Sequence, residues 1–514
     1  MDRGYSGVGR SLYLNAKNTP NRPAIIEEQG KRLSYGELNT IVNKLANHLL
    51  SSGCQKGDHV GILLGNSAEH IVALYAAAKI GAVSISLDPR CTAREMAATQ
   101  AYIGCKFLVC EDTFLPLISN DDLKAADWRV VAFSRQGVGD GLADILRQAV
   151  ADEPTGAHFD HDVSTLMLTS GTTGLPKGCV RTNRVIECSF KDIQDGLDDG
   201  TQELVVVPVY YGSGRGRVMR QIWAGGTLHL MDAFDPERVA SYITAQEISC
   251  IALAPTMCVR LLSLNDLDRF EFGSLRMLQK AGSPFSPEMT KELMRKITPN
   301  IYQAFATSET GTAAALRSHE QLRKLGSSGK PIIGVELDIV AADGTILPRG
   351  EPGEIRVRGP QVCDGYYNKQ VEQDKAFRDG WYYTGDLGHI DEDGYLYVVG
   401  RKKDMIKTGS INVAPLEIEQ AIQRARGIQD ATIVGVPDPQ WGEAVMAIVV
   451  AAAGDMTDEI IAHCRQTLAS YKIPKYFQYV ESIERNSQGK VTTRFKESCV
   501  ARHVLERSAQ NGRN

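Results

Sequence analysis

Strand-like and helix-like segments alternate through the first half of this chain, and this alternation limits the folds open to it. A first series places apolar strand patterns at 59–64, 82–87 and 107–110, with helices expected over 73–80 and from residue 92. A second series places strand patterns at 204–207, 227–230 and 250–254, with helices near 217–223 and from residue 236. Parallel strands joined by helices are covered on both faces. The sequence therefore predicts two α/β layers packed on each other.

The pattern changes in the second half. Short strands separated by Asp-Gly and Pro-Gly turns are expected at 335–340, 354–358 and 395–399, which indicates a small antiparallel or barrel-like subdomain over about 330–400. Beyond the polar bend Gly400–Asp404, two helices and three strands suffice for a separate α+β domain. We therefore expect an N-terminal domain over 1–400 and a C-terminal domain over 401–514.

Composition narrows the class of protein. A chain of 514 residues is longer than one hydrophobic core usually spans, so two or more domains are expected. A net charge of -5 without a basic run argues against nucleic acid as a partner. The 11 cysteines, scattered without a CxxC pair, predict reduced and mostly buried thiols, and the 10 histidines lack metal-ligand spacing. Without a signal peptide or a membrane-spanning run, a cytoplasmic location is expected.

A glycine-rich stretch, Leu166–Gly178, carries the strongest chemical signal. Three apolar residues read as the end of a buried strand and lead into small and hydroxyl residues, which Lys177 follows. Such residues let backbone N–H groups approach an anion, and the lysine adds a cation for a polyphosphate. A P-loop would instead need Gly-Lys-Ser/Thr. A flexible surface loop is the plainer alternative, which the strand before the loop and the lysine after it disfavour.

Four further stretches stand out at a distance from this loop. They are Phe305–Thr310, Tyr383–Asp386, Gly400–Lys407 and Arg485–Lys490. Each residue alone has an ordinary structural explanation. Glu309 could be a solvated surface acid, Asp386 could form an Asx-turn, and Lys490 could be a solvated loop lysine. It is their joint occurrence, in this order, that carries weight.

Together these motifs resemble the adenylate-forming superfamily of acyl-CoA synthetases, peptide-synthetase adenylation domains and luciferases. The resemblance runs from Leu33–Leu38 to Lys490, and residues 350–366 look most like the acyl-CoA synthetase branch. It implies an α/β fold with a large N-terminal AMP-binding domain, a β-rich subdomain and a smaller, mobile C-terminal domain. It also implies that a small carboxylic acid reacts with ATP to give an acyl-adenylate and pyrophosphate, and then with coenzyme A. The protein would act as a monomer or a homodimer.

By this resemblance the ATP site comprises a phosphate-binding loop, an adenine wall and a ribose pair. The phosphate-binding loop would contain Thr169, Ser170, Gly171, Thr172, Thr173, Gly174 and Lys177. The adenine wall would contain Ala281, Gly282, Ser283, Phe305 and Ala306, and the ribose pair would be Asp386 and Arg401. Glu309 would bind Mg²⁺, which suits one carboxylate with phosphate oxygens and water. Ser308, with Thr307 beside it, would reach the α-phosphate.

The resemblance also assigns roles to the C-terminal part. Lys490 would stabilise the charge that builds between the carboxylate oxygen and the α-phosphate. Lys403 stands at the hinge position about which the C-terminal domain would turn before thiol attack. Gly409 and Ser410 stand along the CoA channel, and Ser410 replaces a glycine of the family pattern.

The acyl pocket is expected around Tyr210, Tyr211, Gly212, Ser213 and Arg215, with Tyr211 in a place where the family usually has histidine. Arg215 or Arg217 could pair with a second carboxylate on the substrate. Alternatively, both arginines face solvent or pair with acids on the helix surface. We favour the second alternative, so a medium-length or aromatic acid is the expected substrate.

The sequence motifs are compatible with several functions. The first is an AMP-forming acyl-CoA ligase of fatty acid metabolism. The second delivers the acyl group to a carrier-protein phosphopantetheine, or stops at the adenylate, and has Ser410 as its only support. A non-catalytic nucleotide-binding regulator is disfavoured by the intact charged residues. A luciferase-like oxidation would reuse the same adenylation site.

Overall fold

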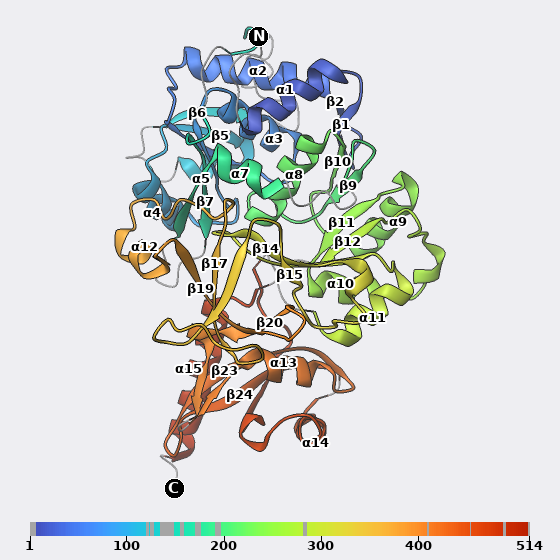
Figure 1. The fold of residues 1–514 in the computed structure, drawn as a ribbon, viewed down its shortest axis with the longest axis vertical. Coiled ribbons are helices and arrows are strands. Elements are labelled where there is room, and N and C mark those ends of the chain that lie inside the picture. Colours follow the sequence, from blue (N-terminus) through green and yellow to red (C-terminus); the bar gives the residue numbers. More distant parts are fainter. Residues whose placement is uncertain are drawn as a thin grey trace.

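The computed structural model describes residues 7–119, 123, 128–133, 149–154, 159–169, 176–190, 197–280, 285–408, 411–452, 454–486 and 490–511. The chain runs from an upper N-terminal part to a small C-terminal part at the opposite end (Figure 1). Among the described helices, none is long and apolar enough to span a membrane.

The first sheet has six strands in the order β6-β5-β3-β4-β7-β8. Its strands are β3 (His59–Leu63), β4 (Val83–Ser86), β5 (Phe107–Glu111), β6 (Arg129–Phe133), β7 (Val163–Thr169) and β8 (Lys177–Thr182). All pairs are parallel except β7–β8. The associated helices are α1 (Val8–Asn18), α2 (Tyr35–Ser51), α3 (Ala68–Lys79), α4 (Ala93–Ile103), α5 (Leu115–Ile118) and α7 (Asn183–Phe190).

The second sheet has nine strands in the order β15-β14-β13-β12-β11-β9-β10-β1-β2. Its strands are β1 (Pro23–Glu27), β2 (Arg32–Ser34), β9 (Gln202–Val205), β10 (Thr227–Leu230), β11 (Cys250–Leu253), β12 (Met277–Lys280), β13 (Ile301–Thr307), β14 (Gly311–Leu316) and β15 (Lys330–Pro331). The connecting helices are α8 (Gly212–Ala224), α9 (Pro236–Gln246), α10 (Pro255–Leu262) and α11 (Pro287–Lys296). The two predicted α/β layers are therefore present.

One hydrophobic core joins the two large sheets. It contains side chains of β3 and β5 from the first sheet, β9 and β10 from the second, and the helices α2, α3 and α8. Helices that pack against both sheets lie between them, because each sheet must bury an apolar face. This arrangement places α8 in the interior of the large domain, which becomes important for its arginines.

The third sheet is antiparallel, as the turn pattern predicts. It contains β16 (Glu336–Val340), β17 (Gly353–Arg358), β18 (Phe377–Arg378), β19 (Trp381–Ile390) and β20 (Leu396–Arg401), with α12 (Gln370–Ala376) beside it. Asp-Gly turns such as Asp393-Gly394 favour tight hairpins because glycine accepts a positive φ, which is 86° at Gly394.

The C-terminal part has its own core of aliphatic side chains. Its strands are β21 (Ile406–Thr408), β22 (Ile411–Val413), β23 (Ile428–Asp438), β24 (Gly442–Ala451) and β25 (Tyr476–Tyr479), and its helices are α13 (Pro415–Gln423), α14 (Thr457–Cys464) and α15 (Thr493–Asn511). The boundary near residue 400 and the mobility of this part stay predictions.

The ends of several helices follow from local capping residues. Ser34 and Glu37 form the predicted capping box at the start of α2. Helix α3 begins earlier than predicted because Ser67 caps it and accepts a hydrogen bond from the backbone of His70. Of the 11 cysteines, only Cys91 and Cys188 are not buried, which confirms the prediction of mostly buried thiols.

Candidate active site

The glycine-rich stretch connects two antiparallel strands. Thr169 ends β7, Lys177 begins β8, and the two residues are paired across the ladder. The Thr169 hydroxyl donates to the Lys177 carbonyl at 3.4 Å. The intervening loop, with the predicted residues Ser170, Gly171, Thr172, Thr173 and Gly174, lies outside the described residues. The described ends show that Lys177 stands at the base of a strand–loop–strand unit.

Glu309 lies in the turn between β13 and β14. Thr307 and Thr310 stabilise this turn, since the hydroxyl of each accepts the backbone N–H of the other, at 3.1 and 3.2 Å. The Glu309 carboxylate is 9% exposed and accepts a hydrogen bond from the Tyr366 hydroxyl at 2.8 Å. Burial, reinforced by the charge of Glu309, raises the pKa of Tyr366, so this hydroxyl stays a donor.

Tyr366 also connects Glu309 with the phosphate-loop lysine. The Lys177 ammonium lies 5.1 Å from the centroid of the Tyr366 ring, within the range of a cation–π interaction. One tyrosine thus contacts the predicted Mg²⁺ ligand through its hydroxyl and the predicted phosphate ligand through its ring face. Sequence reasoning missed this role, because Tyr366 is far from both residues along the chain.

Arg181 is a second residue whose role the sequence did not reveal. Its guanidinium is buried and donates to the Ser308 carbonyl at 3.0 Å and to the Ser189 hydroxyl at 2.7 Å. Burial lowers the pKa of Arg181, and the negative charge of Glu309 opposes this effect. Arg181 therefore fixes the backbone of the turn that carries Ser308 and Glu309.

Asp386 and Arg401 lie on paired strands, β19 and β20, and face each other in the register. The Arg401 Nε donates to the Asp386 carboxylate at 2.6 Å. Burial raises the pKa of Asp386, while the charges of Arg401 and Lys490 act in the opposite direction. The two predicted ribose ligands are thus adjacent, one a buried acceptor and the other a half-exposed donor.

Lys490 belongs to the C-terminal part, where it bonds Asn486. The Asn486 N–H donates to the Lys490 carbonyl at 2.7 Å, and the Lys490 N–H donates to the Asn486 side chain at 3.0 Å. Lys490 keeps contact with solvent, yet the surrounding protein desolvates its ammonium and lowers its pKa. Arg401 and Lys403 lower this pKa further, whereas Asp386 and Glu309 raise it.

These mutual charge effects locate Lys490 relative to the large domain. A charge shifts the pKa of another group only over a short range, so Lys490, Asp386 and Glu309 occupy one neighbourhood. The structure therefore brings together the predicted residues Glu309, Asp386, Arg401 and Lys490 from four separate stretches of the chain.

The predicted adenine wall is described only in part. Ala281, Gly282 and Ser283 lie outside the described residues. Phe305 on β13 is 8% exposed and packs within the core shared with the third sheet, whereas Ala306 beside it is exposed. Stacking of adenine on Phe305 stays a prediction.

The predicted hinge residue Lys403 lies in a short 3-10 turn, Lys402–Asp404, between β20 and β21. Lys402 forms an ion pair with Glu354 at 2.9 Å. Gly409 and Ser410, the predicted channel residues, lie outside the described residues.

Tyr211, one of the predicted acyl-pocket residues, has a defined environment. Its hydroxyl donates to the Asp88 carboxylate at 2.5 Å and accepts a hydrogen bond from Arg90 at 3.0 Å. Its ring centroid lies 4.9 Å from that of Tyr210. Tyr211 is therefore held by residues of the first sheet's β4–α4 connection, and histidine's acid–base capacity is absent at this position.

The glycines of this region allow close packing at the start of α8. A Cβ on Gly212 would lie 2.4 Å from the Met167 sulfur, and a Cβ on Gly214 would lie 2.2 Å from the Pro208 carbonyl oxygen. Ser213 is exposed in the same turn. The first turn of α8 thus packs against β7 two residues before the phosphate loop begins.

The arginines of α8 do not face solvent, so that part of our sequence interpretation was wrong. Arg215 is 3% exposed and Arg217 is 5% exposed. Arg217 pairs with Glu203, a fully buried residue of β9, and also bonds Gln279. The acid partner of Arg217 is therefore in the interior, where α8 packs between the two sheets, and not on the helix surface.

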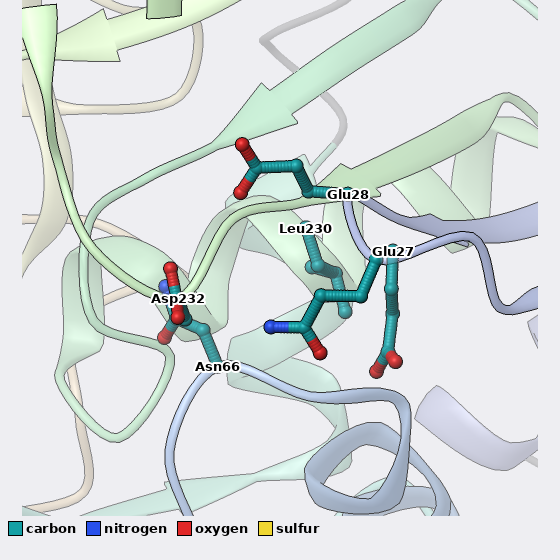
Figure 2. A pocket seen from close by; sticks show the side chains of 6 residues that line it. Glu27, Glu28, Asn66, Leu230 and Asp232 are labelled. Carbon is teal, nitrogen blue, oxygen red and sulfur yellow. The ribbon is translucent and has the colours of Figure 1, made fainter. Parts of the chain in front are cut away.

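A cleft at the ends of β1 and β10 is a separate feature (Figure 2). It is lined by Glu27, Glu28, Gln29, Asn66, Leu230 and Asp232. Its carboxylates already have partners, since Glu27 accepts the Ala68 N–H at 2.6 Å and Arg238 bonds both Glu28 and Asp232. This cleft therefore does not form a cation site.

Metal binding at this site would depend on Glu309. Within the described residues, no group of three or more His, Cys, Asp or Glu side chains could hold a metal ion by itself. A lone buried carboxylate at Glu309 fits Mg²⁺, which binds through one or two carboxylates together with phosphate oxygens and water. The donor set is thus compatible with Mg²⁺ that arrives with a nucleotide.

Comparisons with known proteins identify the family of this chain. The AMP-binding enzyme family model matches residues 12–367, and the model of the AMP-binding enzyme C-terminal domain matches residues 417–490. The long-chain-fatty-acid–CoA ligase FadD13 of Mycobacterium tuberculosis is 32% identical over 94% of this chain and 96% of its own length. A 2-succinylbenzoate–CoA ligase of a Geobacillus species is 32% identical over 98% of both chains.

A solved relative supports the same assignment. The o-succinylbenzoate CoA synthetase MenE of Bacillus subtilis, in complex with its acyl-adenylate intermediate, superposes with a TM-score of 0.83. It is 28% identical, with coverage of 94% of this chain and 96% of that one. Taken with the paired Asp386 and Arg401, the buried Glu309 and the nearby Lys490, these matches show that the chain belongs to the AMP-binding enzyme family, in its acyl-CoA synthetase branch.

Proposed function

We propose that this protein activates a carboxylic acid with ATP and transfers the acyl group to coenzyme A, with release of pyrophosphate and AMP. The observation that carries the proposal is the charge environment of Lys490. A lysine of the C-terminal part lies within electrostatic reach of Glu309 and Asp386 of the large domain. A cation at this junction suits a reaction in which negative charge builds on the α-phosphate.

In the first step a carboxylate oxygen attacks the α-phosphorus of ATP, and the bond to the pyrophosphate oxygen breaks. Such phosphoryl chemistry depends on positioning and charge neutralisation more than on covalent catalysis. We assign Lys177 to the departing phosphates, Ser308 to the α-phosphate, and Asp386 with Arg401 to the ribose. Lys490 would neutralise the charge shared by the attacking oxygen and the α-phosphate.

Glu309 would hold Mg²⁺ against the phosphates, and the ion would supply further charge neutralisation for the leaving pyrophosphate. Tyr366 would orient the Glu309 carboxylate through its hydroxyl, which donates at 2.8 Å. Arg181 would keep the turn in place through the Ser308 carbonyl. Both positioning contacts, Tyr366 with Glu309 and Arg181 with the Ser308 carbonyl, are made within this chain.

In the second step the thiolate of coenzyme A attacks the adenylate carbonyl, a thioester forms and AMP leaves. Delivery to a carrier-protein phosphopantetheine, or release of the adenylate, is the alternative that Ser410 favours. Lys403 would be the pivot between the two steps, since hinge residues lie at the ends of elements and absorb the change in dihedral angle.

Product analysis tests the proposal. Mass spectrometry is applied to mixtures of enzyme, ATP, MgCl₂ and one acid of a broad panel, with and without coenzyme A. We expect AMP and acyl-CoA with coenzyme A for at least one acid. Acyl-adenylate without any thioester would favour the carrier-protein alternative, and the absence of AMP with every acid would contradict adenylation.

A further inference from the structure

Helix α8 contains three buried arginines, Arg215, Arg217 and Arg220. A buried guanidinium is costly unless an anion pairs with it. Within the described residues, the ion pairs of these arginines involve one carboxylate, that of Glu203 on β9. The buried face of α8 therefore has more positive than negative charge.

Glu203 is fully committed to two of the arginines. Arg220 donates to its two carboxylate oxygens at 2.9 and 3.1 Å, and Arg217 pairs with one of the same oxygens. Arg217 also bonds Gln279. These two arginines thus share the charge of Glu203, although the Nε of Arg220 has no hydrogen-bond partner, and Arg215 is left as the arginine of this helix without a carboxylate partner among the described residues.

Arg215 has few partners for its charge. It is 3% exposed, one of its terminal nitrogens bonds the Ser84 hydroxyl on β4, and its Nε has no hydrogen-bond partner. No carboxylate in the described part of the chain pairs with it. Burial, together with the like charge of Arg181, lowers the pKa of Arg215 to about 9, so it remains a cation at neutral pH.

The position of Arg215 connects it to the reaction centre. It lies one turn of α8 beyond Gly212, which packs against Met167 just before the phosphate loop. It is close enough to Arg181 for their charges to interact, and Arg181 bonds the carbonyl of Ser308. Arg215 therefore lies within one helical turn of Gly212 and Ser213, two of the predicted acyl-pocket residues.

We propose that Arg215 binds a second carboxylate of the substrate, so that the acid activated by this enzyme is a dicarboxylic acid. The proposal rests on the proposed ligase function and adds its substrate class. Arginine binds a carboxylate through two parallel N–H donors, which suits a guanidinium whose Nε has no partner and whose terminal nitrogen has the Ser84 hydroxyl as its recorded partner. The same cation disfavours acids with a distal ammonium group, because like charges would meet in a buried site.

The test compares pairs of straight-chain acids of equal carbon number, one monocarboxylic and one dicarboxylic, from malonate to suberate. Acid-dependent release of pyrophosphate from ATP gives kcat/KM for each, and the ω-amino acids serve as the cationic series. We expect at least one dicarboxylate to exceed its monocarboxylate partner by about tenfold to hundredfold, the range of a hydrogen-bonded charge pair. The ω-amino acids are expected to be the poorest substrates.

Variants assign this preference to Arg215. R215M should remove most of the dicarboxylate preference, measured as the ratio of kcat/KM within each pair of acids, and R215K should retain only part of it. R269M, at an exposed arginine paired with Glu237, is the matched control and should leave the ranking unchanged. Thermal unfolding with a non-cleavable ATP analogue gives a readout apart from turnover: the preferred dicarboxylate should raise the Tm of the wild type and not that of R215M.

The outcomes separate the two proposals. Preference for monocarboxylates by the wild type, or an unchanged ranking in a folded R215M, would overturn the dicarboxylate inference and leave the ligase function intact. Failure of every acid to release pyrophosphate would refute the ligase function itself. If R215M does not fold, the wild-type comparison of paired acids still decides the matter.

Discussion

Replacement of Tyr366 by phenylalanine isolates one contact of the candidate site. The variant loses the hydroxyl that donates to Glu309 at 2.8 Å and keeps the ring that lies 5.1 Å from the Lys177 ammonium. A hydrogen bond to a charged group contributes about 1.5–3 kcal/mol. Glu309 is 9% exposed, so solvent replaces the lost donor poorly and we expect most of this energy to be lost.

The loss of this hydrogen bond should weaken binding of the metal–nucleotide complex, because Glu309 is assigned to Mg²⁺. We expect Y366F to lower kcat/KM for ATP by about tenfold to hundredfold, with partial recovery at high MgCl₂, since each 1.4 kcal/mol corresponds to a factor of ten. Acid-dependent exchange of labelled pyrophosphate into ATP, measured over a range of MgCl₂ concentrations, provides the assay. Y366L should lose more, because it also removes the ring beneath Lys177.

The neighbouring tyrosine supplies the control. Tyr367 packs its ring edge-on against His59 and Tyr102, at centroid distances of 5.2 and 6.0 Å. Y367F should therefore retain the wild-type dependence on MgCl₂. Equal MgCl₂ dependence in Y366F and wild type would refute the positioning role of Tyr366.

Three other substitutions test separate parts of the account. Lys490→Ala should raise the barrier to adenylation by ~2–4 kcal/mol in the same exchange assay, and an unchanged rate would reject its role. Gly214→Ala should destabilise the fold by about 1–3 kcal/mol in denaturant unfolding, because its Cβ would lie 2.2 Å from the Pro208 oxygen, whereas Gly216→Ala meets nothing within 4 Å and should be nearly neutral. Burial lowers the pKa of Lys280 from 10.5 to about 7. Below pH 7 the buried ammonium therefore destabilises the folded state by its full amount. Between pH 7 and pH 10.5 this destabilisation decreases as the pH rises, and above pH 10.5 it is absent. Lys280→Met should therefore raise stability at pH 7 by a few kcal/mol, on the order of one to three, and flatten the pH dependence above it; an unaltered pH profile would contradict this reasoning.

The sequence predicted features that depend on neighbours along the chain. Ser34 and Glu37 form a capping box from adjacent positions, and Thr227–Leu230 and the start of α9 at Pro236 follow from apolar runs and their boundaries. Helix α8 was predicted too short. Its first turn contains Gly212 and Gly214, which have low helix propensity, and only the close approach of Met167 and Pro208 explains their presence there.

Contacts between distant segments could not be predicted in the same way. The hydroxyl of Tyr366 reaches Glu309, and Arg181 reaches Ser308, across more than fifty residues of sequence in each case. Our interpretation of Arg215 as a surface residue also failed for this reason. A glycine- and arginine-rich segment has the composition of an exposed helix, and its burial results from the two sheets that enclose it.

The central claim is that a substrate carboxylate oxygen attacks the α-phosphorus of ATP in the site around Lys490. An acid labelled with heavy oxygen in its carboxylate tests this most directly, after one turnover with ATP and coenzyme A. The account predicts that the AMP carries one labelled oxygen and that the pyrophosphate carries none. Label in pyrophosphate or in inorganic phosphate would contradict it, because the attack would then have occurred at another phosphorus.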